Sequence, residues 1–237
     1  MPLPKIATPT YELELPSTGQ NISYRPFLVK EEKVLLQALE TSDDVEIKNA
    51  IKDIVSTCTF GQVNAGNLPT FDLEYIFLQI RAKSVGETAK IRLLCPDDKE
   101  TYVNHDIDLT KVEVQVDEGH TNKIELTKDT GLIMTYPTFK TMDSLGDTKL
   151  KSENMLDVIS SCILQIYENK GEKVYEAKDQ TKAELIEFLE QLNSTQFTEV
   201  RKFFDTMPKL KHDVKVKNPK TKKESKITLT GLNDFFA

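Results

Sequence analysis

Several residue types are scarce or absent in this sequence, and each absence excludes a class of protein. The 237 residues include no Trp and only nine Gly, which disfavours an aromatic-rich binding surface or a Gly-rich phosphate-binding loop. No apolar run approaches the roughly 18 residues that a membrane-spanning helix requires. The first residues show no cationic stretch followed by an apolar one, so we expect no secretory signal. The composition favours a globular protein without a membrane span.

Cysteine is also scarce and lacks the spacing of a metal-binding motif. The chain has three cysteines and no CxxC pair: Cys58, Cys95 and Cys162. This odd number predicts free thiols in a reducing compartment. Cys95 and His105 would lie on opposite arms of a hairpin, as in a zinc ribbon, but a structural zinc needs four ligands. The second hairpin offers Asn218 and no cysteine, so we predict a degenerate, metal-free arrangement, and the sequence leaves open whether Cys95 retains a metal.

Charge is distributed unevenly along the chain. The formal net charge is −7. Between Lys209 and Lys226, however, eight Lys stand against two acidic residues, which gives this segment +6 and the remainder −13. A basic hairpin on an acidic body favours docking onto a complementary protein. Binding of nucleic acid phosphates by this hairpin is the alternative, although it lacks the interleaved aromatic residues that stack on bases.

The hydrophobic pattern predicts an α+β fold, with helical segments, an N-terminal β-hairpin and two further β-hairpin modules. Residues 1–9 hold three prolines and form an extended arm, and residues 11–25 alternate apolar and polar side chains around a turn. Helices follow at 30–41 and 44–57. We expect three segments: an N-terminal part (1–87), a β-rich subdomain (88–136) and a helical C-terminal part ending in the basic hairpin (137–237).

The C-terminal part is expected to begin with a helix that carries Leu156, Ile159 and Tyr167 on one face and ends at Gly171. A short strand at 174–175 follows. Thr181 and Glu184 have the spacing of a capping box, which predicts a helix start. A further helix begins at Ser194, and Pro208 ends it.

The central segment 71–81 is apolar on every side of a helix, which predicts a buried helix. Seven of its eleven residues are large and apolar, interrupted by Asp72, Glu74 and Arg81. These polar residues form either a cluster that contacts a partner or a partly exposed, ion-paired seam, and the spacing of Glu74 and Arg81 favours the seam.

No catalytic motif is present. The sequence contains no GxSxG, HExxH, P-loop or GxGxxG pattern. The adjacent carboxylates Asp43-Asp44 and Asp97-Asp98 are interpreted as a helix cap and a turn. Cys58 and Cys162 are interpreted as buried packing thiols, and His120 as a loop tip. We therefore predict a protein that is not an enzyme, with no cofactor and no small-molecule substrate.

Two turns resemble each other in sequence. Residues 95–99 (Cys-Pro-Asp-Asp-Lys) and residues 218–222 (Asn-Pro-Lys-Thr-Lys) each lie between predicted strands. An internal duplication and two independent hairpins both account for this similarity.

Three motifs resemble the baseplate hub family of T-even-like tailed bacteriophages, which includes a hub subunit and a hub-assembly factor. They are Tyr-Glu-Leu-Glu-Leu-Pro-Ser-Thr-Gly at 11–19 with the following residues 24–33, the central segment 71–87, and the ending Ile-Thr-Leu-Thr-Gly-Leu-Asn-Asp-Phe-Phe at 227–236. The similarity covers nearly the whole chain. Relatives can carry cysteine knuckles in both hairpins, whereas this chain keeps only Cys95.

The resemblance implies a structural or assembly protein of the viral tail that binds other tail and baseplate hub proteins. It is expected in the virion baseplate, or in the host cytoplasm during tail assembly, and the sequence leaves open whether it is a permanent subunit or a transient assembly chaperone. The predicted docking elements are the arm (1–9) and the following residues: Lys215, Lys217, Lys220, Lys222, Lys223, Phe235 and Phe236. A nucleic-acid-associated factor that uses a degenerate zinc-ribbon-like hairpin is the alternative function.

Overall fold

The structure is a computed structural model and describes residues 6–41, 43–143 and 155–236. The chain forms two compact units: unit 1 comprises residues 1–115 and 209–237, and unit 2 comprises residues 116–208. These units group the chain differently from the three segments expected at 1–87, 88–136 and 137–237, because the C-terminal hairpin packs with the N-terminal part. The fold is α+β, as predicted.

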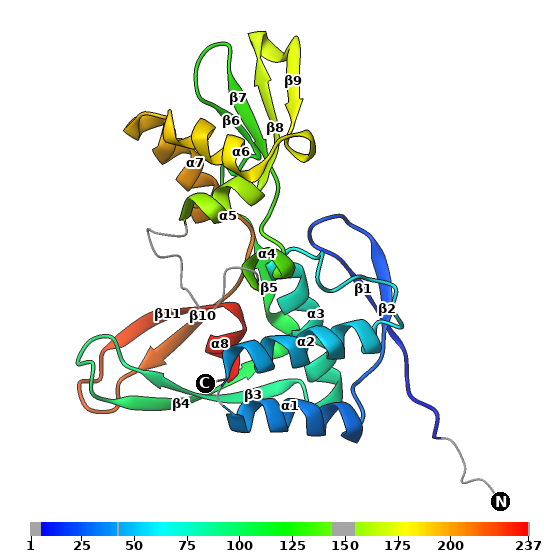
Figure 1. The fold of residues 1–237 in the computed structure, drawn as a ribbon. Coiled ribbons are helices and arrows are strands. Elements are labelled where there is room, and N and C mark those ends of the chain that lie inside the picture. The colour runs from blue at the N-terminus through cyan, green and yellow to red at the C-terminus, as the bar shows by residue number, and fades with distance from the viewer. Residues whose placement is uncertain (1–5, 42, 144–154, 237) are drawn as a thin grey trace, which may run out of the picture. The chain divides into compact units, whose positions relative to one another are not determined.

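Unit 1 combines helices with three small antiparallel sheets, ordered β1-β2, β3-β4 and β11-β10-β5 (Figure 1). Its elements are β1 (Tyr11–Glu14), β2 (Asn21–Tyr24), α1 (Val29–Thr41), α2 (Asp44–Cys58), α3 (Thr70–Val85), β3 (Thr88–Leu94), β4 (Tyr102–Asp108), the 3₁₀ turn η1 (Leu109–Lys111), β5 (Glu113–Gln115), β10 (Lys209–Lys217), β11 (Glu224–Thr230) and α8 (Gly231–Phe236).

Unit 2 is a four-stranded antiparallel sheet, ordered β6-β7-β8-β9, with helices packed against it. Its elements are β6 (Lys123–Glu125), β7 (Gly131–Met134), α4 (Phe139–Asp143), α5 (Met155–Ser161), β8 (Ile163–Glu168), the 3₁₀ turns η2 (Asn169–Gly171) and η3 (Ala177–Asp179), β9 (Lys173–Glu176), α6 (Lys182–Glu190) and α7 (Ser194–Thr206). The core of this unit includes Leu132, Ile159, Leu189, Val200 and Phe203.

The predicted N-terminal hairpin and the helices after it are confirmed. Leu13 lies opposite Ile22 in the β1–β2 register, and both side chains are buried. Asp43 caps α2, because its carboxylate accepts a hydrogen bond from the Val45 N–H at 2.8 Å. Residues 1–5 of the predicted arm and Ser42, which precedes the cap, lie outside the described residues.

Helix α3 is the buried helix that the sequence predicts. Eight of its sixteen residues are buried, on all sides of the helix: Phe71, Asp72, Leu73, Ile76, Phe77, Leu78, Ile80 and Ala82. The elements α2, η1, β5, β10 and α8 contact it, so this helix forms the centre of the unit's core.

The polar residues of α3 connect distant segments of unit 1 to this core. Asp72 is fully buried and accepts hydrogen bonds from the backbone N–H of Ser17, at 3.1 Å, and from its hydroxyl group. Glu74 accepts a hydrogen bond from the backbone N–H of Leu232 in α8. Gly231 has φ +71°, and a Cβ there would lie 3.4 Å from the Glu74 carboxylate. Asp72 therefore fixes the turn of the first hairpin, and Glu74 fixes the start of the last helix.

The predicted helix from Leu156 to Gly171 is wrong. Helix α5 ends at Ser161, and β8 occupies residues 163–168. Leu156 and Ile159 lie in α5, whereas Tyr167 lies in a strand that pairs with β7 on one side and β9 on the other. Pairing with both neighbouring strands outweighs the local pattern. The capping box predicted from Thr181 and Glu184 is confirmed at the start of α6. A second capping box, formed by Asn193 and Gln196, begins α7.

The half-buried carboxylate of Glu74 in α3 gives the core of unit 1 a dependence on pH. Burial raises the pKa of Glu74 from 4.5 to about 7. Folded chains therefore keep a proton that unfolded chains release between these pH values, and the free energy of unfolding falls as the pH rises from about 4.5 to about 7.

Among the described residues, no helix is long and apolar enough to span a bilayer.

We predict that Glu74→Gln removes this loss of stability. Gln keeps an oxygen that can accept the Leu232 N–H but carries no charge. The free energy of unfolding of the variant, relative to that of the wild type, should rise by up to roughly 3 kcal/mol between pH 5 and pH 8. Urea denaturation at both pH values measures this difference. Glu12→Gln on the exposed side of β1 is the matched control, and an equal pH response of the Glu74→Gln variant and the wild type would contradict the prediction.

Candidate partner-binding site on the C-terminal hairpin

The predicted lysines lie together on the hairpin formed by β10 and β11. The register pairs Val214 with Ile227 and Lys215 with Lys226. Successive side chains of a strand point to opposite faces of the sheet. Val214, Val216 and Asn218 are buried in unit 1, which turns the intervening lysines outward. The five lysines of the predicted site are all exposed: Lys215, Lys217, Lys220, Lys222 and Lys223.

The acidic residues of the hairpin are engaged by lysines outside its tip. Asp213 forms an ion pair with Lys226 at 2.8 Å, and Glu224 lies 4.0 Å from Lys217. Lys220, Lys222 and Lys223 follow one another closely in the turn between the strands. The tip therefore concentrates positive charge, and its exposure keeps these side chains accessible to an acidic partner.

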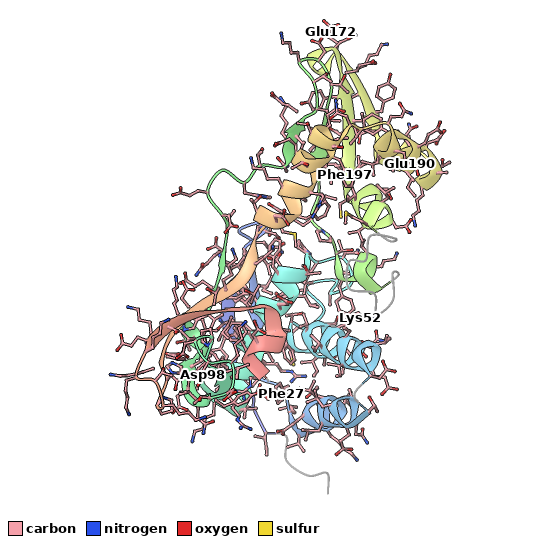
Figure 2. All side chains as sticks on the ribbon, turned by 90° about the vertical axis from the view of Figure 1, so that its left-hand side faces the viewer. Phe27, Lys52, Asp98, Glu172, Glu190 and Phe197 are labelled. Atoms are coloured by element: carbon pink, nitrogen blue, oxygen red, sulfur yellow. The ribbon has the colours of Figure 1, made fainter. Side chains whose placement is uncertain are left out.

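Hydrogen bonds to the β3–β4 hairpin hold the tip in place. The two hairpins point in the same direction (Figure 1), and Asp98 is labelled at the tip of the β3–β4 hairpin in Figure 2. The Asn218 side-chain amide donates to both carboxylate oxygens of Asp97, at 2.9 and 3.1 Å, and the Thr221 hydroxyl donates to the same carboxylate. Asn218 is only 1% exposed, so water does not compete for these hydrogen bonds. The turn that carries the lysines is therefore held in one position.

The two turns share a backbone hydrogen bond and a residue with positive φ. The N–H of Lys99 donates to the carbonyl of Cys95 at 3.0 Å, and the N–H of Lys222 donates to the carbonyl of Asn218 at 2.9 Å. Lys99 and Lys222 also both have positive φ, 54° and 64°. The sequence similarity of the turns thus corresponds to a structural similarity, while a duplication as its origin stays a prediction.

The predicted turn role of Asp97 and Asp98 is confirmed. The Asp98 carboxylate accepts the N–H groups of Glu100 and Thr101, and the Thr101 hydroxyl group holds the pKa of Asp98 well below its usual range. Hydrogen bonds from Asn218 and Thr221 lower the pKa of Asp97. Both carboxylates are therefore ionised at neutral pH and act as acceptors that stabilise the turns.

A zinc-ribbon-like character is not shown. Among the described residues, no group of three or more His, Cys, Asp or Glu side chains is arranged to hold a metal ion. Cys95 is buried and lies near Asp97 and Asp98, and its burial raises the pKa of the thiol. His105 lies on β4 opposite Ile91. Asn218 stands at the position in the second turn that corresponds to Cys95, and it forms hydrogen bonds with Asp97 there.

The side chain of Phe235, one of the predicted docking residues, is not exposed. This side chain is 1% exposed and belongs to the core of unit 1, because α8 turns back onto α3 after Gly231. The side chain of Phe236 lies outside the described residues. Among the named docking residues of the C-terminal hairpin and tail, the accessible ones in the described structure are therefore the five lysines.

Cys58, Cys162 and His120 occupy structural environments. The two thiols are buried, and burial raises their pKa values to about 11 and about 12, which confirms them as packing residues. His120 follows a turn, but its ring also contacts Tyr136 and Phe203, with centroids 5.7 and 5.2 Å away. No local pattern in the sequence indicates this cluster, because Tyr136 and Phe203 are 16 and 83 positions from His120.

We predict that Asn218→Asp loosens the tip of the basic hairpin. The new carboxylate can still accept the N–H groups of Lys220 and Thr221, but it cannot donate to Asp97 and carries the same charge. Hydrogen-exchange protection of the β10–β11 amides should fall roughly tenfold, as expected for the loss of one buried hydrogen bond.

A reciprocal exchange supplies the matched control for this prediction. Asp97→Asn combined with Asn218→Asp restores a donor opposite an acceptor, so protection should recover in the double variant. Asn104→Asp on the exposed side of β4 should leave the hairpin unchanged. Equal protection in Asn218→Asp and the wild type would show that the contact between the turns does not hold the tip.

Comparisons with known proteins identify the family of this chain. The family model described as T4 bacteriophage base plate protein matches residues 8–237. Searches of curated proteins and of solved structures gave no significant match. The matched region includes both units, the central helix α3 and the basic hairpin. The chain therefore belongs to the T4 bacteriophage base plate protein family.

Proposed function

We propose that this baseplate protein is a non-enzymatic hub component or hub-assembly factor that acts through contacts with other tail proteins. The observation that carries the proposal is the fixed hairpin tip with its exposed lysines, Lys215, Lys217, Lys220, Lys222 and Lys223. A rigid charged surface limits the conformational entropy that is lost on binding. Family membership supports tail proteins as the partners, and a baseplate location.

The charge pattern favours an acidic protein surface as the ligand of this hairpin. The segment 209–226 carries +6 in a chain whose net charge is −7, so the positive region is local, and electrostatic attraction would orient the hairpin towards its partner. Binding of nucleic acid is the alternative. It is favoured by the same lysines but lacks support from Phe, Tyr or Trp, since none lies between 209 and 226.

We predict that reversing the charge of the hairpin disrupts assembly without unfolding the protein. Lys215, Lys220 and Lys222 are replaced together by Glu, and the tagged chain is purified from infected cells. Recovery of its tail-protein partners should fall at least about tenfold, because charges on a contact surface guide association. The control replaces the exposed lysines Lys33, Lys128 and Lys178 by Glu, which changes the net charge equally.

The outcomes separate the candidate functions. Equal loss in the hairpin variant and the control variant would reject the hairpin as the contact. Binding of duplex or single-stranded DNA by the purified chain, with a steep dependence on salt, would support the nucleic acid alternative. Mass spectrometry of purified virions distinguishes a permanent hub component, which is present in finished particles, from an assembly factor, which is absent.

A further inference from the structure

Strand β9 of unit 2 is an open sheet edge. It pairs with β8 and is the last strand in the order β6-β7-β8-β9, as Figure 1 shows at the outer side of the sheet. Val174 is 49% exposed and Tyr175 is 42% exposed. Since N–H and C=O groups alternate sides along a strand, β9 directs some of them away from β8. Such an edge can accept another strand.

A cavity adjoins this edge on the side of α6. It has a volume of about 300 Å³, and its apolar walls come from Ile166, Tyr175, Leu185 and Phe188. Tyr175 belongs both to the open edge and to the cavity wall. An extended segment paired with β9 could therefore place one apolar side chain in the cavity while its backbone pairs with the strand.

The surroundings of the cavity are acidic. Glu168 and Glu184 contribute to its walls, and Glu168 accepts a hydrogen bond from the Tyr175 hydroxyl at 3.2 Å. Between residues 168 and 190 the chain has seven Asp or Glu and four Lys. Glu172, labelled at the end of the β8–β9 hairpin in Figure 2, adds to this charge. A segment with a basic residue beside an apolar one would match this surface.

The N-terminal arm of the chain has this chemistry. Ile6 is 93% exposed, it follows Lys5, and residues 6–10 form no helix or strand. Pro4 and Pro9 bracket four residues that keep their backbone N–H groups, and four residues is also the length of β9. Proline flanking residues favour an extended backbone, which lowers the entropy lost on docking.

We propose that the arm of one copy of this protein binds to unit 2 of a second copy, with residues 6–8 pairing with β9 and Ile6 entering the adjoining cavity. The rest of unit 1 does not cover the Ile6 side chain, so this side chain is available for a contact with a second copy. Pairing between copies would bury an apolar side chain and an open strand edge in one step. This contact is independent of the basic hairpin and of its tail partners.

Self-association of the purified full-length chain tests the proposal. Sedimentation equilibrium should show association that depends on protein concentration. Ile6→Asp should weaken it at least about tenfold, because a carboxylate cannot enter an apolar, acid-rimmed cavity. Tyr175→Arg should have a similar effect, because it alters the cavity wall and repels Lys5. Val116→Asp, at a side chain that is 57% exposed in the same unit, is the matched control and should leave association unchanged.

A peptide measures the contact directly. A blocked synthetic peptide with the sequence of residues 1–10 should bind the Ile6→Asp chain and compete with self-association of the wild type, whereas a peptide with Asp in place of Ile6 should do neither. Circular dichroism checks the folding of each variant. A wild-type chain that stays monomeric up to its solubility limit, or self-association that neither variant weakens, would overturn the proposal. Loss of tail-protein binding with unchanged self-association would instead concern the hairpin alone.

Discussion

The structure of unit 1 depends on the burial of α3 on all of its sides. An isolated helix with apolar residues around its whole circumference has little stability in water. It is stable only when neighbouring elements cover every side. The first hairpin, α2, β5 and α8 supply these neighbours from segments that are far apart in the sequence. Asp72 and Glu74 make these contacts specific, because a carboxylate in the core must accept hydrogen bonds from suitably placed donors. Ser17 supplies the donors for Asp72, and the Leu232 N–H is the donor for Glu74.

The same constraint explains which features could be predicted from sequence. The uniform apolar character of residues 71–81 predicted a buried helix, and Asp43 and the Thr181/Glu184 spacing predicted helix starts, since these signals are local. The strand at 163–168 was missed because its pairing partners lie in β7 and β9, and its local spacing mimics a helix. The burial of Phe235 was missed for a related reason. The location of Phe235 depends on Gly231, where the chain turns back onto α3. The residues next to Phe235 give no local signal of this turn.

The candidate site was predictable in composition but not in rigidity. The cluster of lysines is evident from the sequence, and their outward direction follows from the alternation of Val214 and Val216 with lysines. The contact between Asn218 and Asp97 joins positions 121 residues apart, and no periodicity indicates it. The sequence similarity of the two turns was the available signal, yet it predicted a relation between the turns and not a bond between them. That bond distinguishes a fixed charged surface from a flexible one.

The placement of unit 2 within the chain has a consequence for biosynthesis. Residues 116–208 form one unit, whereas unit 1 is assembled from the segments before and after them. During translation, α3 leaves the ribosome long before α8 and the basic hairpin, so its apolar surface lacks part of its cover while the whole insertion is synthesised. Unit 2 can complete its contacts first, and the core of unit 1 is complete only after α8 has emerged. Premature termination before Gly231 would therefore remove α8 from the first unit's core and leave the inserted unit intact.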